Sequence, residues 1–287
     1  MIYILLSILF SSGLFVIFKL FNAYKIDTLK AIVVNYIVAF ILGFANSERK
    51  LSIIEVTQQK WIYGALLLGV LFISVFFVMA KTAQNNGVSV ASVAGKMSVV
   101  IPVFFGVFLY SEKMTALKLA GIVIALIAVY LASVKKEKRV VNHTNFIFPI
   151  LLFIGSGAID TIIKYVEINY VPNEEVSIFS GTIFCIAAFL GILISLYKNT
   201  KEKSKFEIKN ILAGVVLGVP NYFSIIFLIK ALQVEGFESS TLFTINNVGI
   251  VISSTLIGLI FFNENLSVKN IVGVFLAIFG ILIVSIA

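Results

Sequence analysis

Charged residues and metal-binding side chains are scarce in this sequence of 287 residues. Asp, Glu, Lys and Arg make up 13% of it, whereas a soluble domain has about 25%. So little charge cannot cover a water-soluble globule, so a soluble fold is excluded. The single cysteine, Cys185, excludes an internal disulfide, and the single histidine, His143, lies in a basic loop. Zinc sites and histidine-based catalysis are therefore excluded, and we expect no cofactor, no metal and no enzyme activity.

Long apolar runs are abundant instead, and the mean hydropathy is +1.08. They recur at about the 20 residues that a helix needs to cross a hydrocarbon core of about 30 Å. A backbone in lipid must satisfy its own hydrogen bonds, so every run is predicted to be helical. We predict an all-α integral membrane protein with ten transmembrane helices near residues 2–21, 29–46, 61–82, 88–110, 116–134, 146–168, 175–197, 209–232, 238–262 and 268–286.

The net charge of +8 lies in short loops between the apolar runs, which indicates membrane orientation and not nucleic-acid binding. Loops on the side of the termini carry five basic residues: Arg49, Lys50, Lys60, Lys113 and Lys118. Loops on the other side carry twelve: Lys25, Lys30, Lys135, Lys136, Lys138, Arg139, Lys198, Lys201, Lys203, Lys205, Lys209 and Lys269. The positive-inside rule slightly favours termini outside the cell and leaves the orientation open.

Internal repetition divides the chain into two halves. Lys19 matches Lys164 at an offset of 145, and Lys81 with Gly87 matches Lys230 with Gly236 at an offset of 149. Glu112 with Gly121 matches Glu264 with Gly273 at an offset of 152. Polar residues and glycines that repeat in order indicate a duplication. We predict one repeat over residues 1–134, a basic linker over 135–145 and a second repeat over 146–287.

Each predicted repeat contains five spans. Because five is odd, the second repeat must enter the membrane from the opposite side to the first. Two inverted repeats around a central site are typical of secondary transporters.

The repeated segments also resemble EamA-type transporters of the drug/metabolite transporter superfamily. The residues that carry the resemblance are Ala80 to Ala83 with Gly87 to Ala91, Ile101-Pro102-Val103, Tyr110 to Lys113 and Gly121, with second-half echoes at Lys230 to Leu232, Gly236, Asn263 to Asn265 and Gly273. The resemblance implies that spans 1, 3, 4, 6, 8 and 9 surround a central cavity. It also implies alternating access without ATP hydrolysis, and the chain has no Walker A pattern.

The predicted function is secondary transport of a small organic metabolite, an amino acid or similar solute, across the cytoplasmic membrane. Efflux is expected from the resemblance alone. Coupling to a proton or to a counter-metabolite stays open, as does the choice between monomer and homodimer. The alternative is a non-transporting membrane sensor or interaction protein of the same fold, which would tolerate loss of the predicted site residues.

Lys96 is the first candidate for substrate binding. It lies about 13 Å into its span at 1.5 Å per residue, and a lysine this deep needs an explanation. Ser92 and Ser89 share its helical face, and Gly95 gives room beside it. The functional interpretation is a cation that binds an anionic substrate group such as a carboxylate. The structural alternative is a buried ion pair.

Two polar groups in the second half complete the candidate site. Asn246 and Asn247 follow Thr241 and Thr244 at the position equivalent to Lys96, where they either face the cavity or bond between helices. Asp160 lies well inside a span, with Lys164 one turn further on. Asp160 either pairs with Lys164 or faces Lys96 and exchanges a proton.

Charged residues near span ends form two matching sets, one at each side of the membrane. We predict that they make gate ion pairs that alternate between open and closed, while snorkelling lysines and loop glutamates are the structural alternative. The sets are Lys19, Lys81 and Glu264 away from the termini, and Lys164, Lys230 and Glu112 on the termini's side.

Two prolines are predicted to bend their helices and free carbonyls towards the cavity. Pro102 follows Lys96 in the same span, and Pro220 precedes Asn221 and Tyr222, which are second-rank candidates for substrate binding. Trp61, near a span end, is predicted to lie in the interfacial aromatic belt.

Overall fold

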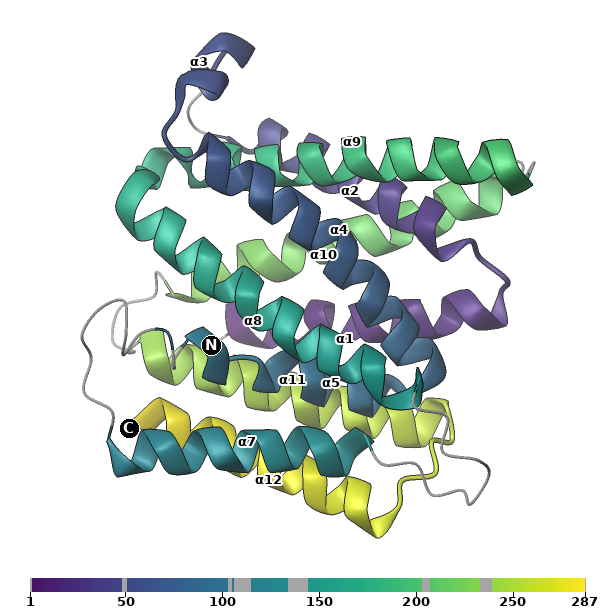
Figure 1. Cartoon of the computed structure of the whole chain (residues 1–287), viewed down its shortest axis with the longest axis vertical. Helices are drawn as coiled ribbons and strands as arrows, with labels where there is room; N and C mark the ends of the chain where they lie inside the picture. Colours follow the sequence, from purple (N-terminus) through teal and green to yellow (C-terminus); the bar gives the residue numbers. More distant parts are fainter. Residues whose placement is uncertain are drawn as a thin grey trace. The chain divides into compact units, whose positions relative to one another are not determined.

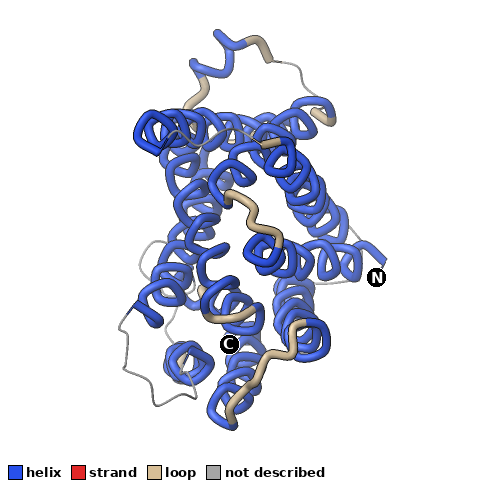
Figure 2. Tube along the Cα trace, turned by 90° about the vertical axis from the view of Figure 1, so that its right-hand side faces the viewer, coloured by secondary structure: helices blue, strands red, loops and turns tan. Residues whose placement is uncertain are grey.

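The computed structural model describes residues 2–47, 51–102, 105, 115–133, 144–202, 207–232 and 239–286. Over these ranges all regular structure is helical (Figure 2). The elements, labelled in Figure 1, are α1 (Ile2–Ala23), α2 (Thr28–Ala45), α3 (Ile53–Gln58), α4 (Ile62–Asn85), α5 (Val88–Met97), α7 (Ala116–Ser133), α8 (Thr144–Tyr170), the 3-10 turn η1 (Asn173–Glu175), α9 (Val176–Glu202), α10 (Ile208–Leu232), α11 (Ser239–Phe261) and α12 (Val268–Ile286).

The predicted all-helical architecture is confirmed. Among the described residues, six helices are long and apolar enough to cross a membrane, namely α1, α2, α4, α8, α9 and α10. Four further apolar segments are shorter as described: Val88–Pro102, Leu119–Ala132, Ile245–Phe261 and Val268–Ile283. The chain is therefore a multi-pass membrane protein, and the count of ten spans stays a prediction.

The chain forms two compact units that do not follow the order of the sequence. Unit 1 contains Met1–Leu20, Val78–Ala158 and Phe223–Ala287, and unit 2 contains Phe21–Phe77 and Ile159–Tyr222. Each unit therefore combines segments from before and after the basic segment 135–145. Four long helices, α1, α4, α8 and α10, run from one unit into the other.

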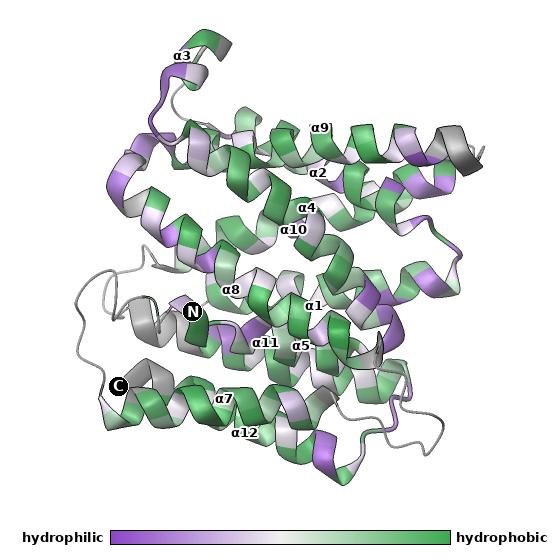
Figure 3. Ribbon diagram, in the orientation of Figure 1, coloured by the Kyte–Doolittle hydropathy of each residue, from purple (hydrophilic) through white to green (hydrophobic). Residues whose placement is uncertain are grey.

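In unit 1, α7 and α12 lie side by side and antiparallel, and both are strongly hydrophobic (Figures 1 and 3). A Cβ on Gly273 would lie 2.5 Å from the backbone nitrogen of Ala132, and one on Gly280 would lie 3.2 Å from Ile124 Cγ2. These distances show that the two backbones approach closely only because glycine has no side chain. Next to this pair, α5 packs between α11, α7 and α12.

In unit 2, α2 is the most enclosed helix and packs antiparallel to α9. A Cβ on Gly43 would lie 3.2 Å from the Cα of Gly181, and one on Gly218 of α10 would lie 2.9 Å from the carbonyl oxygen of Asn35. Tyr36 lies in the middle of α2, where its hydroxyl donates to the carbonyl of Phe72 at 2.8 Å. Small residues and one buried tyrosine therefore join α2 to three neighbouring helices.

The prediction that Trp61 lies in an interfacial belt is wrong. Its side chain is fully buried in unit 2, where Nε1 donates to Glu175 Oε2 at 2.9 Å and the ring packs edge-on against Phe179. Glu175 belongs to η1, so this contact joins the start of α4 to the connection between α8 and α9.

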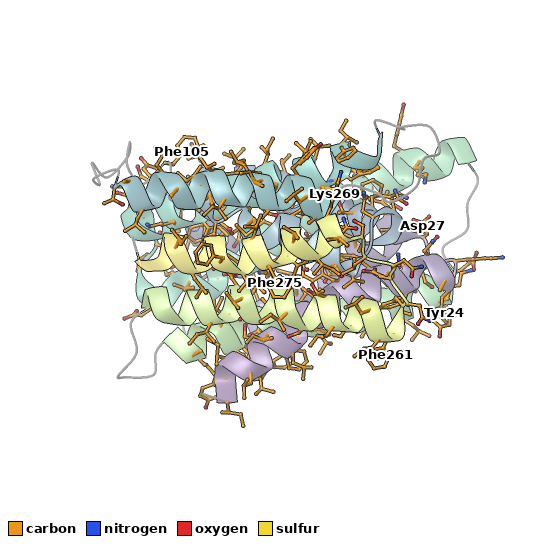
Figure 4. The ribbon with its side chains drawn as sticks, turned by 90° about the horizontal axis from the view of Figure 1, so that it is seen from below. Tyr24, Asp27, Phe105, Phe261, Lys269 and Phe275 are labelled. Atoms are coloured by element: carbon orange, nitrogen blue, oxygen red, sulfur yellow. The ribbon has the colours of Figure 1, made fainter. Side chains whose placement is uncertain are left out.

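Large hydrophobic side chains cover the outside of the helices. Phe261 and Phe275 of unit 1 are 74% and 68% exposed and point away from their neighbouring helices (Figure 4). A protein surface in water rarely exposes many large hydrophobic side chains, whereas a surface in contact with lipid does.

Candidate functional site

Of the two sequence-predicted residues of α5, Ser92 is buried, and Lys96 lies where this helix becomes partly exposed. Every residue from Val88 to Ala94 is buried, including Ser92, whereas Gly95, Lys96 and Val99 are partly exposed. A Cβ on Gly95 would meet only Phe15 Cζ, at 4.0 Å, so there is open room beside Lys96. The hydroxyl of Ser92 donates to the carbonyl of Ser89 at 2.9 Å, so in this state Ser92 is a packed residue beneath Lys96.

The helix is interrupted directly after Lys96. α5 ends at Met97, and helical structure resumes only at Val100. The cause is Pro102, because a proline has no N–H and its ring clashes with the carbonyl four residues earlier, here that of Ser98. The Ser98 hydroxyl donates to the carbonyl of Gly95 at 2.6 Å. Pro102 was predicted to bend its helix, and the structure shows an interruption of the helix before it. Lys96 lies in the last turn before this interruption, at the negative end of the α5 dipole.

The asparagines of α11 lie next to this break. α5 packs against α11 in antiparallel direction, with Ser89 beside Gly258. At equal rise, Asn247 then lies within about one turn of the level of Lys96. Asn246 is 2% exposed, and no described residue donates a hydrogen bond to its Oδ1, while Asn247 is partly exposed. The side chains of Thr241 and Thr244 lie outside the described residues.

The charged residues that were predicted to form gates lie at helix ends. Glu264 accepts from the backbone N–H groups of Val88 and Ser89, and Lys19 Nζ donates to the carbonyl of Gln84 at 3.4 Å. Lys81 lies in the same last turns of α4 and is partly buried.

On the side of the termini, Lys230 is exposed in the last turn of α10, with its ammonium 6.0 Å from the ring centroid of Tyr3. This places a cation over an aromatic face between the start of α1 and the end of α10. Glu112 lies outside the described residues.

The remaining predicted residues belong to unit 2. Asp160 and Lys164 are exposed on α8, whereas Asn221 and Tyr222 are buried in α10, directly after Pro220. α10 continues through Pro220, and the boundary between the two units follows Tyr222. A meeting of Asp160 with Lys96 stays a prediction.

Two polar positions of unit 1 were missed by the sequence analysis. Ser12 of α1 is 1% exposed, and its hydroxyl has no partner among the described residues. Gln84 Nε2 donates to the carbonyl of Phe18 at 3.2 Å. Serines are common in apolar helices, so nothing in the sequence favoured the choice of Ser12. Only a comparison of the buried polar side chains in neighbouring helices would have identified it.

The fold and these groups define an all-helical, multi-pass membrane protein with polar side chains at a broken helix, an arrangement found at the binding sites of secondary transporters. Residues 1–134 match the model of the EamA-like transporter family, which confirms the resemblance over this part of the chain. The family is part of the drug/metabolite transporter superfamily.

Two full-length similarities extend beyond the matched segment. An uncharacterized protein of Haemophilus influenzae is 26% identical over 284 residues, which cover 97% of this chain and 95% of that protein. A protein known from a crystal structure shares the fold over 98% of this chain and 97% of its own, with a TM-score of 0.55 and 16% identity.

Proposed function

We propose that this protein is a secondary carrier that exports a small organic solute, an amino acid or similar metabolite, across the cytoplasmic membrane by alternating access. Ten spans form two inverted five-helix repeats, residues 1–134 and 146–287, joined by the basic linker. Export as the direction and the cytoplasmic membrane as the location rest on the family alone.

Three helix pairs support the inverted repeats. α2 with α9, α5 with α11 and α7 with α12 each occupy equivalent positions in the two halves, and the members of each pair pack against one another. For α2 with α9 and for α7 with α12, the glycine contacts show that the members run antiparallel, because Gly43 meets Gly181 while Val33 meets Gly191, and Gly273 meets Ala132 while Gly280 meets Ile124. Equivalent helices of inverted repeats must cross the membrane in opposite directions.

The observation that carries the proposal is Lys96, a partly exposed cation at the break of an otherwise buried helix. A carboxylate of the substrate pairs with its ammonium, and a donor group of the substrate reaches Oδ1 of Asn246 or the amide of Asn247. Ser92 supports Lys96 from the preceding turn. Asn221 and Tyr222, after Pro220, are further candidates for substrate binding in unit 2, and Asp160 is the residue that exchanges a proton if transport is proton-coupled.

The two charged sets control access to this site. Lys19, Lys81 and Glu264 hold one end closed, and Lys164, Lys230 and Glu112 hold the other, so that one end opens at a time. The partners of the protein are the small solute that it carries and the lipid bilayer that surrounds it. The carrier works as a monomer or homodimer.

A thermal-shift screen of the purified protein against amino acids, nucleotides and organic acids tests the binding site. A ligand at 100 times its Kd stabilises the folded state by about 2.7 kcal/mol. We expect a carboxylate-bearing ligand to raise the melting temperature, and Lys96→Ala to remove that shift. Lys269→Ala, at an exposed lysine of α12, is the matched control and should retain it.

Two outcomes would count against the proposal. A shift with cationic ligands alone would contradict the charge assigned to the site. If cells that carry Lys96→Ala or Asn247→Ala behave like cells with the unmodified protein, a non-transporting sensor of the same fold is favoured.

A further inference from the structure

Glu264 binds the first turn of α5, although it is predicted to pair with a lysine. Its Oε1 accepts from the N–H of Val88 at 2.7 Å, and its Oε2 accepts from the N–H of Ser89 at 3.4 Å and from the Ser89 hydroxyl at 3.0 Å. The first N–H groups of a helix have no partner within the helix, and a carboxylate is the strongest acceptor that a protein can offer them. Glu264 therefore caps α5 from the connection between α11 and α12.

Two glycines make the room that this carboxylate occupies. Gly87 has a φ of 109°, which favours glycine, and a Cβ there would lie 2.7 Å from Glu264 Oε1. A Cβ on Gly258 of α11 would lie 2.5 Å from Glu264 Oε2 and 2.9 Å from the hydroxyl of Ser89. The carboxylate thus fits a space bounded by α5 on one side and α11 on the other.

A cation acts on the other side of the same turn. Lys19 Nζ approaches the carbonyl of Gln84, in the last turn of α4, while Gln84 Nε2 donates back to the carbonyl of Phe18. The carboxyl end of α4 therefore receives a positive charge and the amino end of α5 a negative one. Each charge matches the helix dipole that it faces.

We propose that Glu264 is the positioning residue of α5, and that release of its carboxylate from the Gly87–Ser89 turn frees this end of α5 during each transport cycle. The inference rests on the proposed carrier function and specifies the contact that keeps one end of the site closed. Glu264 contacts the start of α5 while Lys19 contacts the end of α4, so each of these two charges holds a helix end.

The geometry explains why closure and hydration are coupled. One carboxylate joins the helix that carries Ser92 and Lys96 to the helix that carries Asn246 and Asn247. When it leaves, the two N–H groups and the hydroxyl that it bound must find other acceptors, because unpaired donors in an apolar environment are costly. Water supplies those acceptors only where this end is open, so release and opening occur together.

Maleimide labelling measures this opening without a known substrate. Cys185→Ala removes the single cysteine, and Gly95→Cys places a reporter beside Lys96, where an added Cβ has room. A membrane-impermeant maleimide is applied separately to each face of sealed vesicles. We expect Glu264→Gln to raise the labelling rate from the Glu264 face by about tenfold or more, the equivalent of one charge-assisted hydrogen bond.

Two variants calibrate this result. Ser89→Ala removes one donor and should give a smaller increase from the same face. Glu207→Gln neutralises an exposed carboxylate of unit 2 and should leave the rate unchanged. If Glu264→Gln lowers the melting temperature but leaves labelling from both faces unchanged, Glu264 is a structural cap only and the proposal is overturned.

Charge reversal separates a helix-end contact from an ion pair. Exchange of the two signs in Lys19→Glu with Glu264→Lys would restore a Lys–Glu pair. If the two residues instead bind helix ends, the exchange places an anion at the carbonyls that end α4 and a cation at the N–H groups that begin α5. Both contacts are then repulsive, so the double variant should be labelled faster than either single variant. Restoration of slow labelling in the double variant would overturn the proposal. If the labelling rates change as expected but no ligand shifts the melting temperature, the proposed carrier function is contradicted. The proposed role of Glu264 at the start of α5 is then still supported.

Discussion

Glycine contacts join helices in both compact units, but α5 of unit 1 is held in place differently from α2 of unit 2. In unit 2, α2 meets α9 and α10 through glycines whose backbones touch, and buried aromatic rings fill the remaining space around Tyr36. In unit 1, α5 is held at its amino end by a carboxylate and is interrupted at its carboxyl end by Pro102. Unit 1 contains Lys96 and Asn246, whereas unit 2 contains the more exposed Asp160.

The two kinds of contact differ in whether water can replace them. Backbone contact at glycine depends on dispersion and has no substitute once the helices separate. A charged hydrogen bond at a helix end can be replaced by water at small net cost. Unit 2 is therefore suited to a fixed pairing of helices, and the α5 region of unit 1 to a movement. Substitutions in both regions test that contrast.

Gly214→Leu should break the fixed pairing in unit 2. A Cβ at Gly214 would already lie 2.7 Å from the carbonyl oxygen of Ala31, which is backbone and cannot turn aside. We expect the free energy of unfolding to fall by about 3 kcal/mol or more, measured by thermal unfolding in detergent. The control is Gly13→Leu in α1 of unit 1, where nothing lies within 4 Å of an added Cβ. Equal losses for both variants would refute the role of close packing.

Trp61→Phe should weaken unit 2 less. It keeps an aromatic ring against Phe179 but removes the donor to the buried carboxylate of Glu175. A lost hydrogen bond to a charged group costs about 2 kcal/mol. Thermal unfolding of Trp61→Phe, with and without Glu175→Gln, measures this cost. The double variant should recover part of the loss, and an unchanged melting temperature in the single variant would contradict the contact.

Pro102→Ala should affect transport more than folding. Alanine restores the N–H and removes the clash with Ser98, so the helix can continue beyond Met97 and Lys96 is no longer in a last turn. We expect an unchanged or higher melting temperature and a fall in transport on the order of tenfold, which corresponds to 1.4 kcal/mol. Counterflow of the ligand found in the thermal-shift screen measures the rate. A variant with full transport would show that the break is dispensable.

Lys209→Gln should have the smallest effect. The hydrogen bond and charge of Lys209, 2.7 Å from Glu207, lower the pKa of the Glu207 carboxyl from its ordinary value of 4.5. Because the folded pKa is the lower one, this pair stabilises the fold above the ordinary carboxyl pKa, and the contribution is lost as the pH falls through the lowered value. Both side chains are exposed and screened by solvent. Melting temperatures of the variant and the parent at neutral pH and at about pH 4 should therefore agree, and a clear difference would mean that this pair is structurally important.

Helix positions could be read from the sequence because the bilayer sets the length of an apolar run. The predicted spans near 2–21, 29–46 and 209–232 coincide closely with α1, α2 and α10. The short helix α3 and the turn η1 could not be found in this way, because they are short and carry polar residues. A bend at Pro102 was predicted from the sequence, since the chemistry of proline is local, but the interruption at Ser98 and Val99 was not.

The partners of the polar residues were beyond the sequence. Lys96 was selected for its depth and is indeed the partly exposed cation of its helix, but Trp61 was misassigned because its partner Glu175 lies 114 residues away. Glu264 was expected to meet a lysine because opposite charges attract. A free helix end attracts a carboxylate equally well and leaves no separate mark in the sequence.

The lengths of the apolar runs predict where helices can cross a membrane, since hydrocarbon accepts only helical segments of sufficient length. Pro102 predicts a distortion of its span, since proline has no N–H to continue the helical hydrogen bonds. Which groups meet is visible only in the folded protein. Glycines at the crossings set how closely α5 approaches α11 and α2 approaches α9, and that approach brings Glu264 to the first turn of α5, 175 residues earlier in the chain.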